Sequence, residues 1–117
     1  MHRAEQSFEE RLERNPLEQQ DRRVFEVLRD MDPGVQGTFD DYVVVNFTDG
    51  AGRFAEIRMS RDQDDMSAYT LNANVGSPLA MIEFFERLRA SDVSITKMVS
   101  YSASKEENER FQQILKE

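Results

Sequence analysis

Apolar and polar residues alternate in three successive runs between residues 38 and 75, and this period of two predicts three β-strands. The runs cover 38–48, 53–61 and 66–75, and a Gly-rich turn and an acidic break separate them. Because both connections are short, the pattern predicts an antiparallel meander. The side chains expected to face the core are Phe39, Val43, Val45 and Phe47, then Ala55, Ile57 and Met59, then Tyr69, Leu71, Ala73 and Val75.

The turn between the first two strands must bring their apolar residues to the same face. A loop of three residues, 50–52, pairs Phe47 with Ala55 and meets this condition, whereas loops of two or four residues do not. Such a loop places one residue in a left-handed conformation, for which Gly52 is suited. We therefore explain the turn glycines by structure rather than by phosphate binding.

Helical periodicity follows four N-terminal capping signals along the chain. These signals are Ser7 with Glu10, Asn15 before Pro16, Ser77 before Pro78, and Ser104 with Glu107. We expect a first helix to end near Arg14, and a second to end at the Asp32-Pro33-Gly34 segment.

A further strand is predicted at residues 93–101, after the third helix. Its expected inward set is Val93, Ile95, Val99 and Tyr101. Lys97 interrupts this set, and we expect its ammonium group to reach an edge or a carboxylate.

The predicted order is α-α-β-β-β-α-β-α. It indicates an α+β fold in which an antiparallel sheet, formed by the meander 38–75 and strand 93–101, has its helices packed on one face. At 117 residues the chain has the size of one domain, so we expect a single domain over 1–117 with residues 1–6 frayed.

The second face of this sheet is predicted to be rich in Ser, Thr and Asn, with a few apolar residues among them. Tyr42, Val44, Phe54 and Met98 would form a modest apolar patch there. Exposed apolar patches often mark binding sites, so we predict that these four residues bind a partner. The alternative is that water covers this face.

Composition excludes several kinds of chemistry. The chain has no cysteine and one histidine, His2, so thiolate or histidine metal sites and the usual nucleophilic triads lack their residues. No membrane span and no secretory leader are visible, and we expect a cytoplasmic protein. The net charge of −8 disfavours direct binding to a nucleic-acid backbone.

No recognisable catalytic motif stands out among the remaining polar residues. Asp62, Asp64 and Asp65 offer oxygen ligands of the kind calcium prefers, but the further ligands of a calcium loop are missing, and a solvated strand connection explains them better. Asp40, Asp41, Glu56 and Arg58 are strand-edge charges without a visible catalytic arrangement. We expect a non-enzymatic protein without a cofactor; the alternative is an enzyme that uses Asp or Glu, Tyr or Lys97.

The acidic charge and the order of helices and strands resemble those of the small acidic chaperones of type III secretion, although no motif contributes to this resemblance. Such chaperones are cytoplasmic dimers that bind an unfolded segment of another protein. We therefore expect a protein-binding module of inhibitor or immunity type, an adaptor, or a secretion-chaperone-like protein. A basic protein surface is one expected partner, and a homodimer through the same sheet face is the simplest version.

A small-molecule-sensing regulatory domain is the alternative function. Its ligand would lie in a pocket between sheet and helices, with Tyr69, Asn72 and Tyr101 as polar contacts.

Overall fold

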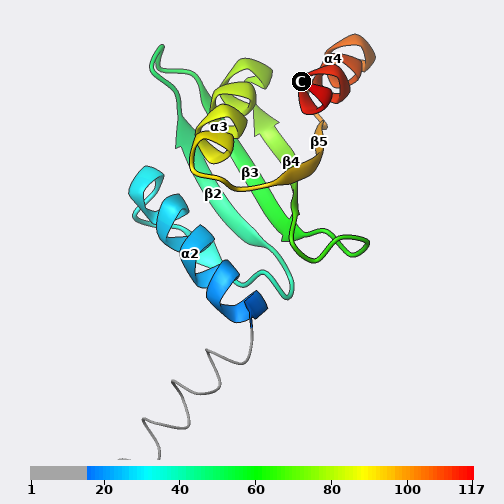
Figure 1. The fold of residues 1–117 in the computed structure, drawn as a ribbon. Coiled ribbons are helices and arrows are strands. Elements are labelled where there is room, and N and C mark those ends of the chain that lie inside the picture. Colours follow the sequence, from blue (N-terminus) through cyan, green and yellow to red (C-terminus); the bar gives the residue numbers. More distant parts are fainter. Residues whose placement is uncertain (1–15) are drawn as a thin grey trace, which may run out of the picture.

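The structure, a computed structural model, describes residues 16–117 (Figure 1). The helix predicted from Ser7 and the predicted frayed residues 1–6 lie outside this range. The elements in chain order are α2 (Pro16–Met31), β1 (Gln36–Gly37), β2 (Val43–Thr48), β3 (Phe54–Arg61), β4 (Tyr69–Gly76), α3 (Pro78–Ala90), β5 (Ile95–Ser100) and α4 (Lys105–Lys116).

The helices begin where the capping signals predicted. α2 starts at Pro16, the Ser77 side chain accepts a hydrogen bond from Ala80 N at the start of α3, and Ser104 and Glu107 form a complete capping box at the start of α4. These signals act within single turns, so they do not depend on the rest of the fold.

The predicted register of the first hairpin is confirmed. Phe47 pairs with Ala55, and a three-residue loop connects the strands. Asp49 N donates to Arg53 O at 2.8 Å, and Gly52 has the left-handed φ of +82° that this loop requires.

The class α+β is confirmed, but the sheet is mixed rather than antiparallel. Its five strands lie in the order β1-β2-β3-β4-β5, and β5 runs parallel to β4. The reason is that α3 carries the chain back along the sheet, so the strand after it repeats the direction of β4. The short strand β1 was not predicted, because two residues are too few to show alternation.

A bulge in β4 reverses the predicted direction of Val75. Ile57 pairs with Ala73 and Glu56 with Val75, so β4 holds one extra residue between these pairs. Val75 therefore leaves the core face and is exposed. Gly76 follows with φ +113°, and a Cβ atom there would lie 2.3 Å from the Phe54 carbonyl oxygen, so only glycine fits this close approach.

A second irregularity reverses most of β5. Tyr69 pairs with Ile95 but Thr70 pairs with Lys97, so one residue of β5 is extra at this point. Beyond it, Met98 is completely buried while Tyr101 is 72% exposed. It was therefore wrong to predict that Val99 and Tyr101 face the core. It was also wrong to predict that Met98 is exposed.

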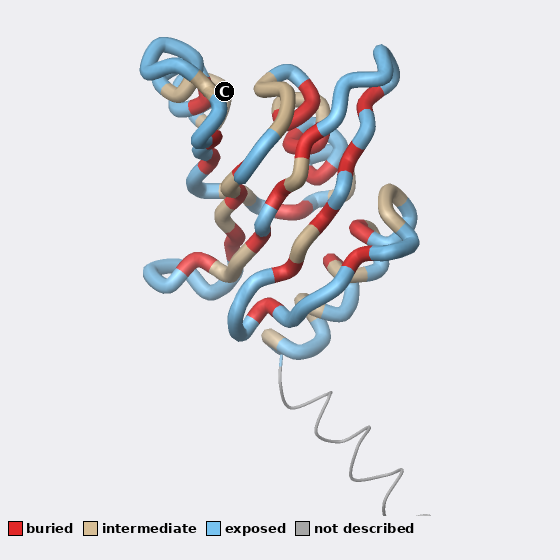
Figure 2. The backbone as a smooth tube through the Cα atoms, turned by 180° about the vertical axis from the view of Figure 1, so that it is seen from behind, coloured by how far each residue is buried: buried red, intermediate tan, exposed pale blue. Residues whose placement is uncertain are grey.

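The core lies between the sheet and the helices. Val24 and Leu28 of α2, Phe84 of α3 and Phe111 of α4 pack with the buried strand residues in one hydrophobic cluster. In Figure 1, α3 lies in front of the strands, and in Figure 2, from the opposite side, the strands lie in front of α3. None of the helices within residues 16–117 lies on this second side of the sheet.

Candidate protein-binding face

The side of the sheet that none of the described helices covers, called the open face from here on, is built from side chains of four strands and of the residues that flank them. Their cross-strand pairings and exposure place them together. The open face consists of Tyr42, Val44, Asn46, Thr48, Phe54, Glu56, Arg58, Ser60, Thr70, Asn72, Val75, Lys97, Val99 and Tyr101. Seven large apolar residues of the described chain are exposed, and five of them belong to this face.

Three of the four predicted partner-binding residues lie on the open face: Tyr42, Val44 and Phe54. The fourth, Met98, lies in the core, for the reason given above. Val75, Val99 and Tyr101 take its place on the open face, and the simple period of two had assigned all three to the core.

One signal could have revealed the error in β5. Period two placed Lys97 on the core face, beside Ile95 and Val99. A charged side chain among core-facing residues is energetically unfavourable. One extra residue in the strand moves the side chains that follow it to the opposite face, and so takes Lys97 out of the core. The structure contains that residue between Ile95 and Lys97.

Two contacts order side chains within the open face. The Arg58 guanidinium lies 4.9 Å from the centre of the Tyr42 ring, a cation–π arrangement. Asn72 Nδ2 donates to the Tyr101 hydroxyl at 3.2 Å, whereas Asn72 Oδ1 is buried and has no hydrogen-bond partner among residues 16–117.

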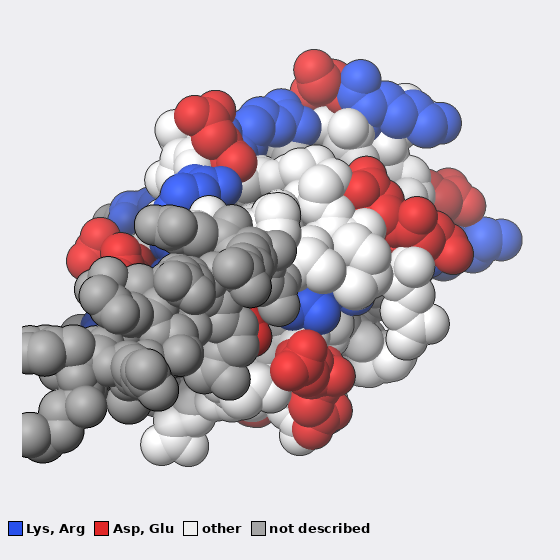
Figure 3. Space-filling view, turned by 60° about the horizontal axis from the view of Figure 1, so that its bottom comes forward, with Lys and Arg blue, Asp and Glu red and all other residues white. Residues whose placement is uncertain are grey.

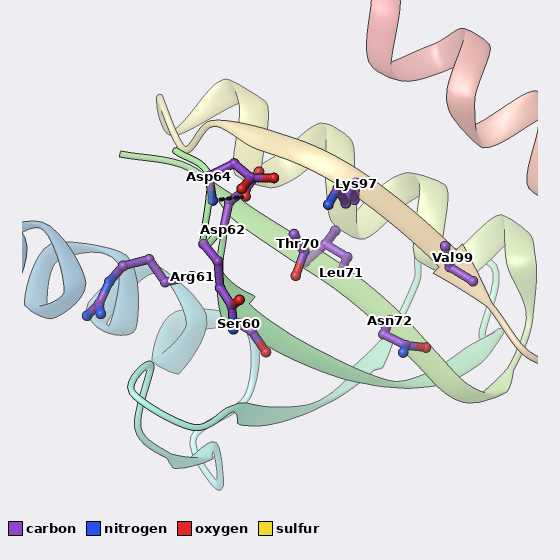
Figure 4. A pocket seen from close by; sticks show the side chains of 10 residues that line it. Ser60, Arg61, Asp62, Asp64, Thr70, Leu71, Asn72, Lys97 and Val99 are labelled. Carbon is purple, nitrogen blue, oxygen red and sulfur yellow. Dashed lines mark hydrogen bonds between the residues drawn. The ribbon is translucent and has the colours of Figure 1, made fainter. Parts of the chain in front are cut away.

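A cavity of about 370 Å³ opens on this face where β3 and β4 reach the acidic 62–65 connection (Figure 4). Thr70, Asn72, Lys97 and Val99 line it from the neighbouring strands, and Asp62 and Asp64 stand at one end. Arg61 points away from the cavity toward α2. The cavity therefore combines one ammonium group, two carboxylates and neutral polar groups beside an apolar side chain.

Helix α4 closes the outer edge of the sheet at β5. Asn108 Oδ1 accepts from Ser100 N at 2.9 Å, and Asn108 Nδ2 donates to Ser100 O at 3.0 Å. Gln112 Nε2 donates to Met98 O at 3.3 Å. Side chains thus occupy backbone groups that an added strand would need.

The opposite edge, at β2, is blunted in a similar way. The short strand β1 covers Val43 and Val44, and Asp32 Oδ2 accepts from Asn46 N at 2.9 Å. Asp32 Oδ1 also accepts from Gly34 N at 2.9 Å. The open face therefore lies between two protected edges.

The other side of β3 carries a charged cluster that joins the sheet to α2. Asp21 of α2 forms an ion pair with Arg61 and accepts from the Tyr69 hydroxyl at 2.5 Å. Gln20 Nε2 donates to the same hydroxyl at 3.0 Å. Burial, followed by the hydrogen bond to Asp21, raises the pKa of Tyr69. Burial alone would lower the pKa of Arg61, but Asp21 raises it.

Two further buried carboxylates already have structural partners. Asp62 accepts from the Thr96 hydroxyl and from Asp64 N, and these hydrogen bonds lower the pKa of Asp62. Burial alone would raise the pKa of Asp49, but hydrogen bonds from Arg53 and Ala51 lower it. Both carboxylates therefore hold loops in place.

The described residues contain no group of three or more His, Cys, Asp or Glu side chains placed to hold a metal ion. Within 16–117, no helix combines the length and the hydropathy needed to cross a membrane.

Figure 3 shows Asp and Glu side chains in separate groups, most of them beside Lys or Arg, rather than as one continuous acidic surface.

The pocket predicted between sheet and helices is not formed by the three residues expected to line it. Tyr69 is buried on the core side against Asp21, whereas Asn72 and Tyr101 meet on the open face. Apart from the cavity on the open face, a second one of about 360 Å³ lies between α2 and α3, and Val27, Met31 and Arg87 are among its lining residues.

Comparison of the chain with models of protein families, with curated proteins and with solved structures finds no match in any of the three.

Proposed function

We propose that this protein is a non-enzymatic module that binds another protein chain through the open face. One observation carries the proposal: the open face holds five of the seven exposed large apolar residues of the described chain, and none of the helices within 16–117 covers it. Aromatic residues are enriched where proteins bind one another, and Tyr42, Phe54 and Tyr101 fit this role.

Side chains already bind backbone groups at both edges of the sheet, and this supports binding through the open face. Asn108 and Gln112 occupy backbone groups of β5, and Asp32 occupies one of β2. A partner segment that adds as a further strand would have to displace these side chains. Side-chain packing onto the open face requires no such change.

The engaged carboxylates favour binding over catalysis. Asp21, Asp49 and Asp62 each accept hydrogen bonds that hold an element or a loop. A general acid or base must instead present its carboxyl group to a substrate. Inhibitor or immunity-type proteins, adaptors and secretion-chaperone-like proteins are the classes that such a module fits, with the cytoplasm as the expected location.

The test is affinity capture from the source organism, followed by titration of the purified partner. Phe54→Ala combined with Tyr101→Ala should weaken binding at least roughly tenfold, because buried aromatic anchors dominate most interfaces. Leu79→Ala is the matched control, since Leu79 is 49% exposed, Phe54 is 44% exposed, and Leu79 lies on α3. Unchanged binding by the double variant would contradict the proposal.

A further inference from the structure

Charge distinguishes the open face from the rest of the molecule. The whole chain carries −8, whereas the open face holds one carboxylate, Glu56, and two cations, Arg58 and Lys97, and two further carboxylates, Asp62 and Asp64, lie at one end of its cavity. Two copies of an acidic chain repel one another over most approaches, and screening limits this repulsion to roughly 10 Å at moderate salt. Contact through a face of near-zero charge avoids the closest like-charge approaches.

Glu56 and Arg58 stand two residues apart on β3, the central strand, with their side chains on the same face. Neither of them forms an ion pair with another of the residues 16–117. The Arg58 guanidinium is held over the Tyr42 ring, so less side-chain freedom is lost when a carboxylate approaches it.

This pair is complementary to itself. In a two-fold dimer, residue i of one copy meets residue j of the other, and j meets i. A two-fold axis that crosses β3 between Glu56 and Arg58 places each carboxylate opposite a guanidinium, so that two ion pairs form together. Val99 lies in the same cross-strand row as Arg58, and Tyr101 lies two residues further along the chain, toward the row of Glu56. The axis that places Glu56 opposite Arg58 therefore also brings Val99 of one copy near Tyr101 of the other.

We propose that the chain that covers the open face is a second copy of this protein, packed sheet against sheet, with Glu56 of each copy paired with Arg58 of the other. This inference rests on the proposed function and names its partner. The protected edges of the sheet direct the second copy to the face, since neither edge is free for strand addition along its length.

Charge exchange tests the arrangement. The variants are E56R, R58E and the double exchange E56R/R58E, measured by sedimentation over a concentration series of the full chain. We expect the wild type to sediment at twice its chain mass of 13.6 kDa. Each single variant places like charges opposite one another twice per dimer, so its dissociation constant should rise roughly 100-fold. The double exchange restores both pairs and should recover the dimer.

Mixing provides a second, independent measurement. E56R has two arginines and R58E two glutamates at these positions, so an equimolar mixture should form a heterodimer although each variant alone is monomeric. Thermal unfolding checks that every variant is folded. E109R and R110E on α4 change the net charge by the same amounts and should leave dimerisation unchanged.

Two results would overturn the inference. One is a wild-type protein that stays monomeric at all concentrations. If the Phe54 and Tyr101 variants still lose a different protein, the proposed function stands and only self-association fails. The other is a wild-type dimer that all three exchange variants retain, because the copies then associate through another surface.

Discussion

The two faces of β3 use charged residues in opposite ways. On the core side, Arg61 is paired with Asp21 and joined to Tyr69, and this cluster attaches α2 to the sheet. On the open face, Glu56 and Arg58 form no ion pair with any of the residues 16–117. On one face of this strand the charged side chains stabilise the fold, and on the other face they form no ion pair within residues 16–117.

The largest expected effect comes from breaking the core-side cluster. Asp21→Ala leaves the Arg61 guanidinium largely buried without its main carboxylate, and should lower the free energy of unfolding by roughly 3 kcal/mol. Denaturant unfolding measures this change. Asp30→Ala, on the exposed side of the same helix, should change it by less than about 0.5 kcal/mol. Equal losses in the two variants would show that the cluster does not stabilise the fold.

The next effect distinguishes the two faces within β5. Met98→Ala removes a completely buried side chain and should cost about 2–3 kcal/mol of unfolding free energy. Val99→Ala, one residue away on the open face, should cost less than about 1 kcal/mol. The reverse order would mean that the strand is not shifted between Ile95 and Lys97.

A smaller effect is expected in alkali. The raised pKa of Tyr69 means that, above about pH 10, the unfolded chain loses this phenolic proton while the native protein still holds it. The native state then binds more protons than the unfolded state, so stability falls as pH rises through this range, by at most about 1.4 kcal/mol between pH 10 and 11. Tyr69→Phe should flatten this fall, measured by denaturant unfolding from pH 9 to 11. Tyr101→Phe, which retains Tyr69, should not.

The smallest effect concerns the charges of the open face. Glu56→Gln should change the unfolding free energy of the isolated monomer by less than about 0.5 kcal/mol, and Arg58→Gln by less than about 1 kcal/mol, because neither forms an ion pair within residues 16–117 and Arg58 loses only its contact with the Tyr42 ring. Unfolding at concentrations where the protein is monomeric checks this. A loss comparable to that of Asp21→Ala would show that these charges maintain the fold.

Local chemistry explains which predictions were correct. The starts of the described helices and the Gly50–Gly52 hairpin depend on residues close in sequence, and the structure has them as predicted. The predicted partner-binding residues were correctly placed on the open face only on β2, at the start of β3, and in the turn before β2. Val75 and Met98 were assigned to the wrong face of the sheet, because each follows an extra residue that turns the later side chains of its strand to the opposite face.

The sequence by itself determined the class of the fold, the starts of the described helices, the first hairpin and the residues that alternate in β2 and β3. Capping, turn geometry and period two act over a few residues, and these features follow from them. Only the tertiary structure decided that β5 pairs in parallel with β4 and which of its side chains face the core. It also decided that Asp32, Asn108 and Gln112 bind backbone groups at the two sheet edges. Those outcomes depend on packing against strands and helices distant in the chain, which a local pattern does not encode.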